Sequence, residues 1–600
     1  MLTKAPNQVE EGDRNISSEL VRQHLKRILS SGLFHRSDRL SRFLQFSVDA
    51  ALDGSSGRAK EYIVGVEVFD RGPSFDARID PVVRVEARRL RARLKQWHET
   101  EGRDSEIVIE LPTGKYSAAF RYRTAVPPTA TIPTVEKTIA VLPFANMNGD
   151  PALDYFSDGL TEELIHLLTR VKGLHVVAWP SARHMKGQEQ DIAAIRDRLQ
   201  VKHVLRGSVR RFGDRLRMTA QLIDVSDERY LWSEAWDRLA SDLLLIEQEI
   251  AGAIVEKLRI DLDPCPSPVI PPSPRDTASH TFYLKGRFHL NKRSPEGMQT
   301  AVEYFEQATG ADRQSALAWA GLADAHALIG TYGLAQPATA MSAARDAAET
   351  AIALDASLAE PVTCLAFVRG YEWKWQEAGE LYRRSIALNP GYSTAHHWYA
   401  TDYLVKLGLV EEAASELDKA IALDPLSSIK LEGRAYVSMV AGRIEEARQQ
   451  YEDLLKHDRW FYMAWSSLGR LYTQIGEYQK AIEMYQTARS IAGDFPKILG
   501  AFGQTLALAG RTTEARAILD LLHTTARTQY VGNSTFALIH LGLGEVDLAL
   551  ERLQQVVAAH ELSATGLNIH PAWDALRPDP RFQALLKQVG LLEIYGKKIP

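Results

Sequence analysis

The stretch Gly408–Pro425 reads GLVEEAASELDKAIALDP, and its pattern returns along the C-terminal half of the chain. Glycines recur every 34 residues, and an alanine follows each of them after five residues. The glycines are Gly408, Gly442, Gly476, Gly510 and Gly544, and the alanines are Ala413, Ala447, Ala481, Ala515 and Ala549. A fixed period of this length indicates a stacked structural repeat.

Each period predicts two helices joined by a tight turn. The glycine ends the first helix, because a left-handed backbone is unstrained only for glycine. The alanine marks the point where the two helices approach too closely for a larger side chain. Extending the alanine series upstream gives Ala378, Ala344 and Ala301, with an insertion of about nine residues between Ala301 and Ala344.

A 34-residue helical repeat with these positions resembles the tetratricopeptide family over residues 278–600, in about eight repeats. The resemblance implies an all-α solenoid whose inner groove binds a protein or peptide. Trp398 and Arg470 fall on first helices at groove positions, so we expect them to contact the partner. A solenoid that serves only as a scaffold remains the alternative for either residue.

Two proline-bearing segments, 124–137 and 263–274, separate the remaining chain into blocks 16–123 and 138–262. The fold expectation is therefore multidomain. The net charge of −5 is unevenly distributed: residues 1–123 hold 22 Lys and Arg against 18 Asp and Glu, which is +4, and the remainder is −9. A basic head on an acidic body suggests an anionic partner for the head.

The segment Asp80–Glu99 (DPVVRVEARRLRARLKQWHE) predicts a helix with two faces. The apolar positions form a buried stripe: Val83, Ala87, Leu90, Leu94 and Trp97. The basic positions form a separate surface: Arg84, Arg88, Arg89, Arg91, Arg93 and Lys95. Alternating residues around a turn at 112–115 predict a hairpin after this helix.

An arginine-rich helix followed by a hairpin, VRVEARRLRARL and then IELPTGKYSAAF, resembles the winged helix-turn-helix output domain of response-regulator-type transcription factors. The resemblance implies an α+β head at 16–123 that binds double-stranded DNA, with its recognition helix in the major groove. By position, Arg84 and Arg88 are candidates for base edges, and Arg89, Arg91, Lys95 and Lys115 are candidates for phosphates. The wing has only Gly114 where the family usually has flanking glycines, and no phosphoacceptor receiver domain precedes the head. The alternative is a solvated arginine face on a domain that binds protein.

The block 138–262 alternates strand and helix signals, which predicts an α/β domain with a mixed sheet. A hairpin is expected at Gly213–Asp214, and a helix is expected to begin after Asp158–Gly159. The block resembles the TolB-like N-terminal domain through IAVLPFAN, YFSDGLTEEL, VLRGSVRRFGDRLRMTAQLID and LWSEAWD. The resemblance implies a binding or coupling module.

No nucleotide-loop, zinc-protease or serine-hydrolase motif occurs, so the sequence predicts no enzyme, no cofactor and no metal site. Asp158, Glu162 and Glu163 are interpreted as helix-start carboxylates that favour the macrodipole. Without a long apolar run or a signal peptide, we expect a cytoplasmic protein with no membrane partner. The sequence hypothesis is a transcriptional regulator with a DNA-binding head and a partner-binding repeat tail. The alternative is a non-enzymatic scaffold whose head binds protein.

Overall fold

The computed structural model describes residues 17–122, 137–258 and 277–592. Short gaps interrupt the first two ranges, at 32, 35–36, 54–59, 73–74, 76–79, 81, 100, 103–104, 106, 113–115, 151–153, 172, 189–190 and 240–241. The chain forms two compact units, Met1–Thr134 and Val135–Pro600. Both predicted linkers fall outside the described residues, except for Lys137.

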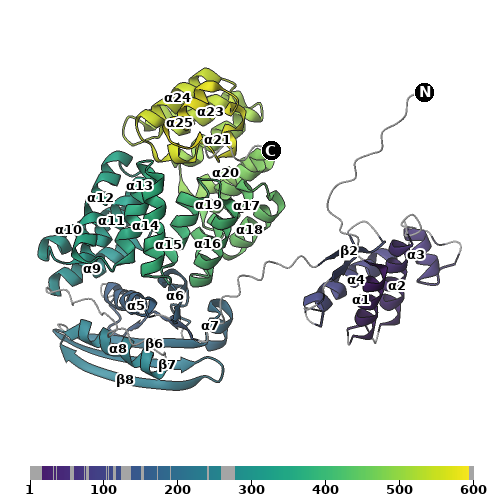
Figure 1. The fold of residues 1–600 in the computed structure, drawn as a ribbon, viewed down its shortest axis with the longest axis horizontal. Helices are drawn as coiled ribbons and strands as arrows, with labels where there is room; N and C mark the ends of the chain where they lie inside the picture. The colour runs from purple at the N-terminus through teal and green to yellow at the C-terminus, as the bar shows by residue number, and fades with distance from the viewer. Residues whose placement is uncertain are drawn as a thin grey trace. The chain divides into compact units, whose positions relative to one another are not determined.

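In the first unit, the residues that the structure describes form four helices followed by a two-stranded antiparallel hairpin (Figure 1). Its elements are α1 Ser18–Ser30, α2 Asp38–Leu52, α3 Glu61–Glu67, α4 Val82–Glu99, β1 Ile107–Glu110 and β2 Ala119–Tyr122. The predicted apolar stripe of α4 is confirmed, because Val83, Ala87, Leu90, Leu94 and Trp97 are at most 2% exposed. This stripe joins Phe43 of α2 and Ile109 of β1 in one core.

Residues 138–258 form the predicted mixed sheet, in the order β5-β3-β6-β7-β8 with β4 beside β6. The strands are β3 Thr138–Val141, β4 Ala145–Asn146, β5 His175–Val176, β6 His203–Phe212, β7 Arg215–Asp224 and β8 Arg229–Leu239. The helices are α5 Asp154–Thr169, α6 Trp179–Arg183, α7 Ile192–Leu199 and α8 Leu243–Lys257. Strand β3 is parallel to β5 and β6, and β6, β7 and β8 are antiparallel.

The prediction for the start of α5 was wrong. The helix begins at Asp154, so Asp158 and Gly159 lie inside it rather than before it. A side chain at Gly159 would place its Cβ 2.9 Å from Leu284, so the glycine lets α9 (Thr277–Leu290) pack closely. Asp158 and Glu163 are buried in the helix interior and do not cap its N-terminus.

The repeats form eight helix pairs between residues 277 and 558. The first four are α9 with α10 Pro295–Ala311, α11 Ala316–Tyr332 with α12 Pro337–Leu354, α13 Ala359–Tyr371 with α14 Trp375–Leu388, and α15 Ser393–Trp398, continued by the π-helical turn η4 Tyr399–Leu404, with α16 Val410–Leu423. The next four are α17 Ser428–Val440 with α18 Ile444–His457, α19 Tyr462–Gln474 with α20 Tyr478–Ala492, α21 Pro496–Leu508 with α22 Thr512–Thr525, and α23 Asn533–Gly542 with α24 Val546–Ala558. The segments η5 Leu562–Gly566, η6 Pro571–Leu576 and α25 Pro580–Gln588 follow.

The sequence period agrees with the backbone of these pairs. The five turn glycines have φ between +71° and +79°, and the eight alanines of the series are all 0% exposed. Each repeat therefore uses its glycine and alanine as the spacing predicts.

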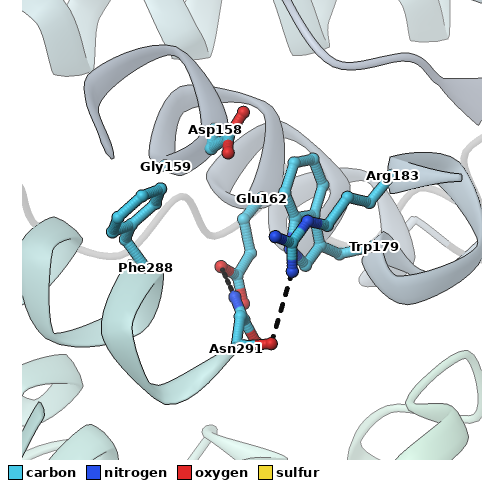
Figure 2. Close-up of a pocket in the computed structure, with 7 residues that line it drawn as sticks. All are labelled: Asp158, Gly159, Glu162, Trp179, Arg183, Phe288 and Asn291. Carbon is cyan, nitrogen blue, oxygen red and sulfur yellow. Dashed lines mark hydrogen bonds between the residues drawn. The ribbon is translucent and has the colours of Figure 1, made fainter. Parts of the chain in front are cut away.

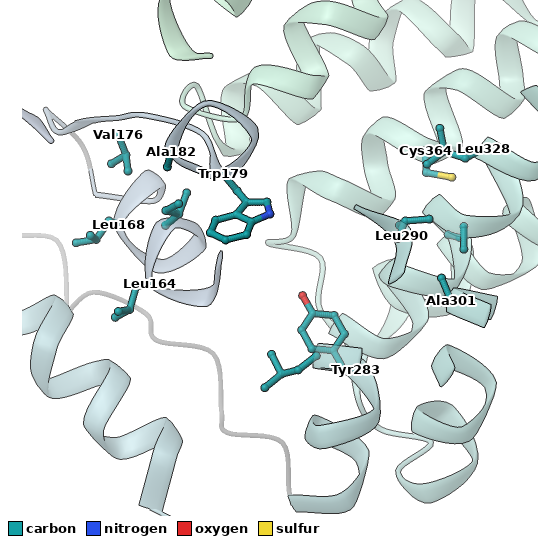
Figure 3. Packing of buried hydrophobic residues seen from close by; sticks show 14 of the residues in the cluster. Leu164, Leu168, Val176, Trp179, Ala182, Tyr283, Leu290, Ala301, Leu328 and Cys364 are labelled. Carbon is teal, nitrogen blue, oxygen red and sulfur yellow. The ribbon is translucent and has the colours of Figure 1, made fainter. Parts of the chain in front are cut away.

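The sheet domain and the repeats share one hydrophobic core (Figure 3). Leu164 and Trp179 belong to the same cluster as Tyr283, Leu328 and Cys364 of the first repeats. Within Val135–Pro600, the sheet domain is thus packed onto the solenoid by a continuous apolar contact.

Candidate functional site

Two basic regions of the molecule could bind a partner, and the first is the exposed side of α4. Arg84, Arg88 and Arg89 are exposed on this helix, opposite the buried stripe. We call these three residues the arginine face. Arg84 donates to Glu61 at 2.9 Å and Arg89 to Glu86 at 2.8 Å. Arg88 makes no hydrogen bond or ion pair with the residues that the structure describes, so its guanidinium can reach a ligand.

Arg91 differs from its neighbours on α4. Its Nε donates to the carbonyl oxygen of Leu111 at 2.8 Å, and one terminal nitrogen donates to Pro112 O at 3.0 Å. The guanidinium therefore ties α4 to the end of β1. Lys115 and the side chain of Lys95 lie outside the described residues.

The second basic region lies on the first helices of the repeats. Trp398 ends α15, where its ring packs 5.1 Å from that of Phe367. Arg470 lies on α19 with its guanidinium 5.7 Å from the centre of the Tyr436 ring. Both residues are thus on first helices, as predicted, and both contact aromatic rings.

Sequence reasoning missed two lysines that lie near Arg470. Lys406 follows the π-helical turn η4, and Lys497 is the second residue of α21. Lys497 Nζ donates to the carbonyl oxygen of Thr331 at 2.8 Å, although 166 residues separate the two in sequence. We call Lys406, Arg470 and Lys497 the inner cluster. The sequence pattern does not predict this cluster, because its three residues come from different repeats and only the curvature of the solenoid brings them together.

The C-terminal segment folds back onto the middle repeats beside Lys406. Trp375 Nε1 donates to Val589 O at 2.8 Å, and the Asn568 side chain donates to Lys406 O at 2.6 Å. A Cβ placed on Gly566 would lie 3.5 Å from Lys406 Nζ. Residues after α24, at the yellow end of the ribbon in Figure 1, therefore contact repeats that lie 162 and 214 residues earlier in the chain.

The surrounding protein lowers the pKa of both lysines in the inner cluster. Surrounding protein lowers the pKa of Lys497 to about 8, with Lys406 and Arg470 adding to the effect, although the side chain keeps contact with solvent. Burial also lowers the pKa of Lys406; Asp402 opposes the shift, and Arg470 adds to it. These like charges favour a negatively charged ligand that would lie among them.

Two carboxylates, those of Asp402 and Glu432, lie near the inner cluster. Burial raises the pKa of Asp402, against the effect of Lys406 and a hydrogen bond from Thr401. Burial likewise raises the pKa of Glu432, whose carboxylate accepts a hydrogen bond from Ser467 at 2.6 Å. Asp402 interacts with Lys406 and Glu432 interacts with Arg470, so each carboxylate lies beside a cation of the inner cluster.

The junction between the sheet domain and the repeats is polar as well as apolar. Asp424, 0% exposed, accepts from the backbone N and the hydroxyl of Ser181 and from Lys430 Nζ. Ser181 belongs to α6, whereas Asp424 and Lys430 belong to the repeats. His166 of α5 also pairs with Glu360 at 3.0 Å. These bonds fix the sheet domain on the solenoid edge.

A small pocket lies at this junction (Figure 2). It is lined by Asp158 and Glu162 of α5, Trp179 and Arg183 of α6, and Phe288 and Asn291 from the first repeat. Its volume of about 10 Å³ holds roughly one water molecule. Glu162 accepts from Arg287 and from Asn291, so this carboxylate is a structural partner at the interface and not a helix cap.

The part of the chain that the structure describes contains no cluster of three His, Cys, Asp or Glu side chains that could hold a metal ion. Among the described helices, none is both long and apolar enough to cross a bilayer.

Comparison with known proteins links the sheet domain to transcriptional regulators. Residues 135–252 match the family model of the second domain of HilA/YgeH-like transcriptional regulators, and residues 431–496 match the tetratricopeptide repeat. The chain thus carries a HilA-like regulator domain and tetratricopeptide repeats. The predicted winged-helix and TolB-like resemblances remain predictions.

Curated relatives agree with this assignment over part of their length. The transcriptional regulator HilA of Salmonella typhimurium is 22% identical over 324 residues, which are 52% of this chain and 55% of HilA. A Rhizobium meliloti protein with an adenylate cyclase name is 39% identical over 166 residues, 28% of each chain. The matched regions thus span between about a quarter and about half of these relatives.

A solved structure, from work on the Pseudomonas aeruginosa protein pilF, is 20% identical with a TM-score of 0.28. It covers 37% of this chain and 97% of its own.

Proposed function

We propose that this chain is a transcriptional regulator that binds double-stranded DNA through its head and a protein partner through its repeats. The observation that carries the proposal is the match of residues 135–252 to the second domain of HilA-like regulators. That match begins directly after a head whose longest helix exposes three arginines.

The head acts as a winged helix in this proposal. Helix α4 enters the major groove, where Arg84 and Arg88 read base edges and Arg89 contacts phosphate. Lys95 and Lys115 contact phosphates as well. Arg91 orients the hairpin relative to α4, since its donors are used by Leu111 and Pro112.

The repeats receive an acidic segment of a partner protein. Its carboxylates pair with the inner cluster, and Trp398 supplies an aromatic surface for the same chain. This chemistry is supported by the mutual repulsion within the inner cluster, which adds to burial in lowering the pKa of Lys406 and of Lys497. A carboxylate bound there would compensate charges that are costly to enclose.

The proposed activity is non-enzymatic and cytoplasmic. Regulator domains and tetratricopeptide repeats bind other molecules rather than transform them, and the cyclase name belongs to a relative that shares 28% of its length with this chain.

The deciding experiment is a titration of the full chain against double-stranded DNA fragments selected from random sequence, at salt concentrations from about 50 to 200 mM. About five phosphate contacts predict that log K falls against log salt with a slope of roughly −4 to −5. A sequence preference that survives excess competitor DNA supports the regulator. Absence of binding by the correctly folded chain would support the protein-binding scaffold instead.

A further inference from the structure

The outer face of β6, β7 and β8 carries a polar hollow of about 440 Å³. Strand alternation places Leu216, Met218 and Leu222 of β7 in the core, and therefore Thr219 and Gln221 on the outer face. Glu234, which also borders the hollow, is paired with buried Ala220, so alternation directs its side chain to the other face.

Small side chains form the floor of the hollow. Ser208, Thr219 and Ala235 lie in one row across the three strands. The hydroxyls of Ser208 and Thr219 are 2.8 Å apart, and Ser233 adds a third hydroxyl in the next row. The floor is therefore shallow, wide and able to hydrogen-bond a polar ligand.

Two arginines face each other at one end of the floor. Arg210 and Arg217 are directly opposite in the register of β6 and β7, two residues beyond Ser208 and Thr219. Both are exposed, and neither makes a hydrogen bond or ion pair with any residue that the structure describes; the Arg210 guanidinium lies 4.7 Å from the centre of the Phe212 ring, which leaves its N–H donors unused. Asp237 is opposite Arg217 on β8, but its carboxylate is bound by Arg215 at 2.6 Å. Like charges directly opposite each other destabilise a strand pair, unless an anion lies between them.

A third arginine is fixed at the opposite end. Arg206 Nε donates to the side-chain oxygen of Gln221 at 3.1 Å, and a terminal nitrogen donates to the Tyr230 hydroxyl at 2.5 Å. The hollow thus lies between Arg206, whose guanidinium is held by two hydrogen bonds, and the pair Arg210 and Arg217, whose N–H donors can bind a ligand.

We propose that this face binds a small phosphate monoester, such as a sugar phosphate, with its phosphate between Arg210 and Arg217 and its hydroxyls on the floor of Ser208, Thr219 and Ser233. Guanidinium groups bind phosphate oxygens in pairs, and two of them match the double charge of a monoester better than a single carboxylate. With this site, the sheet domain would bind a small molecule in addition to acting as the coupling module that the sequence suggests.

The test is calorimetric titration of the full chain with ribose 5-phosphate, ribose and inorganic phosphate. We expect saturable binding of ribose 5-phosphate at one site per chain and no binding of ribose. The variant R210Q/R217Q should bind ribose 5-phosphate about tenfold more weakly or worse. The matched control R196Q/R198Q removes the same charge from exposed positions of α7 and should bind as the unaltered chain does.

A second variant tests the contribution of the hollow independently of the arginine charges. Ala235→Trp keeps every arginine but fills the floor, so it should abolish ribose 5-phosphate binding while inorganic phosphate still binds. Equal affinities in R210Q/R217Q and its control would overturn the proposal, as would an unaffected Ala235→Trp. If ribose 5-phosphate fails to bind and R210Q/R217Q instead weakens DNA binding, the face contacts DNA and the proposal is wrong.

Discussion

The arginine face of α4 and the inner cluster of the repeats are both basic, but they differ in how the protein surrounds them. Arg84, Arg88 and Arg89 are exposed on one helix surface. In the inner cluster, Lys406 and Arg470 are half-buried between repeats far apart in sequence, and Lys497 is exposed but donates to Thr331. Exposed charges are screened by salt, whereas partly buried charges are screened less and interact more strongly with one another. The same net charge therefore suits a polyanion such as DNA in one place and a few carboxylates in the other.

The largest expected difference between the two regions is in salt dependence. Raising salt from about 50 to 200 mM should weaken DNA binding by the full chain about 500-fold, because five released counterions give a slope near −4.5. Binding of a hexaglutamate peptide to the repeats should weaken by less than about tenfold. Titrations of both ligands in the same salt series check the contrast. Equal slopes would mean that the two basic regions bind anions in the same way.

Removing Arg88 should have the next largest effect. Arg88→Ala should cost about 1–3 kcal/mol of DNA-binding free energy at the preferred site, because this guanidinium is available for a base edge. Fluorescence anisotropy with the selected DNA measures the loss. Arg22→Ala removes the same charge from an exposed position of α1 and should leave affinity nearly unchanged. An equal loss of DNA affinity in Arg88→Ala and Arg22→Ala would mean that α4 contributes only nonspecific positive charge.

Removing Arg91 should affect stability rather than recognition. Arg91→Ala leaves the carbonyl oxygens of Leu111 and Pro112 without these donors, so the head should lose about 1–2 kcal/mol of unfolding free energy. Thermal denaturation of the full chain, followed for the head transition, gives the value. Arg88→Ala is the control variant, and it should leave the unfolding temperature of the head unchanged. A loss of DNA affinity without a stability change would make Arg91 a direct DNA contact.

The smallest effect is a pH dependence confined to the inner cluster. The pKa of Lys497 is lowered to about 8, so its charge is present below pH 8 and is lost as pH rises through that value. Hexaglutamate affinity should fall roughly threefold between pH 7 and pH 9, with Lys406 contributing in the same direction. His570 does not contribute to this pH dependence. Burial, with Arg470 and Lys406 adding to the effect, holds the pKa of His570 well below its ordinary value.

Two controls complete the pH experiment. Lys497→Arg keeps its charge throughout this range, so its affinity should stay constant to pH 9. DNA binding by the arginine face should also be constant, because guanidinium groups do not titrate there. A pH step that persists in Lys497→Arg would place the titrating group elsewhere.

Several features of the fold were readable from local patterns. The 34-residue spacing of glycine and alanine predicts the helix pairs, since each turn and each close helix contact needs a particular small residue. The apolar stripe of α4 follows from helical periodicity alone, as does the hairpin at Gly213–Asp214 from turn chemistry. Strand β8 was missed, although its resemblance motif LWSEAWD lies within it, because its outer positions mix aromatic, charged and small residues without a clear alternation.

The sequence by itself determined the repeat architecture and the two faces of α4, because these depend on contacts between residues near in the chain. It also predicted the mixed sheet through the alternation of strand and helix signals, although the parallel partners in that sheet are distant in sequence. Only the tertiary structure decided the inner cluster, the packing of Gly159 against Leu284 and the binding of Asp424 by Ser181 and Lys430. Each of these joins residues from separate elements. Their proximity depends on the curvature of the solenoid and the docking of the sheet domain, which no local spacing in the sequence records.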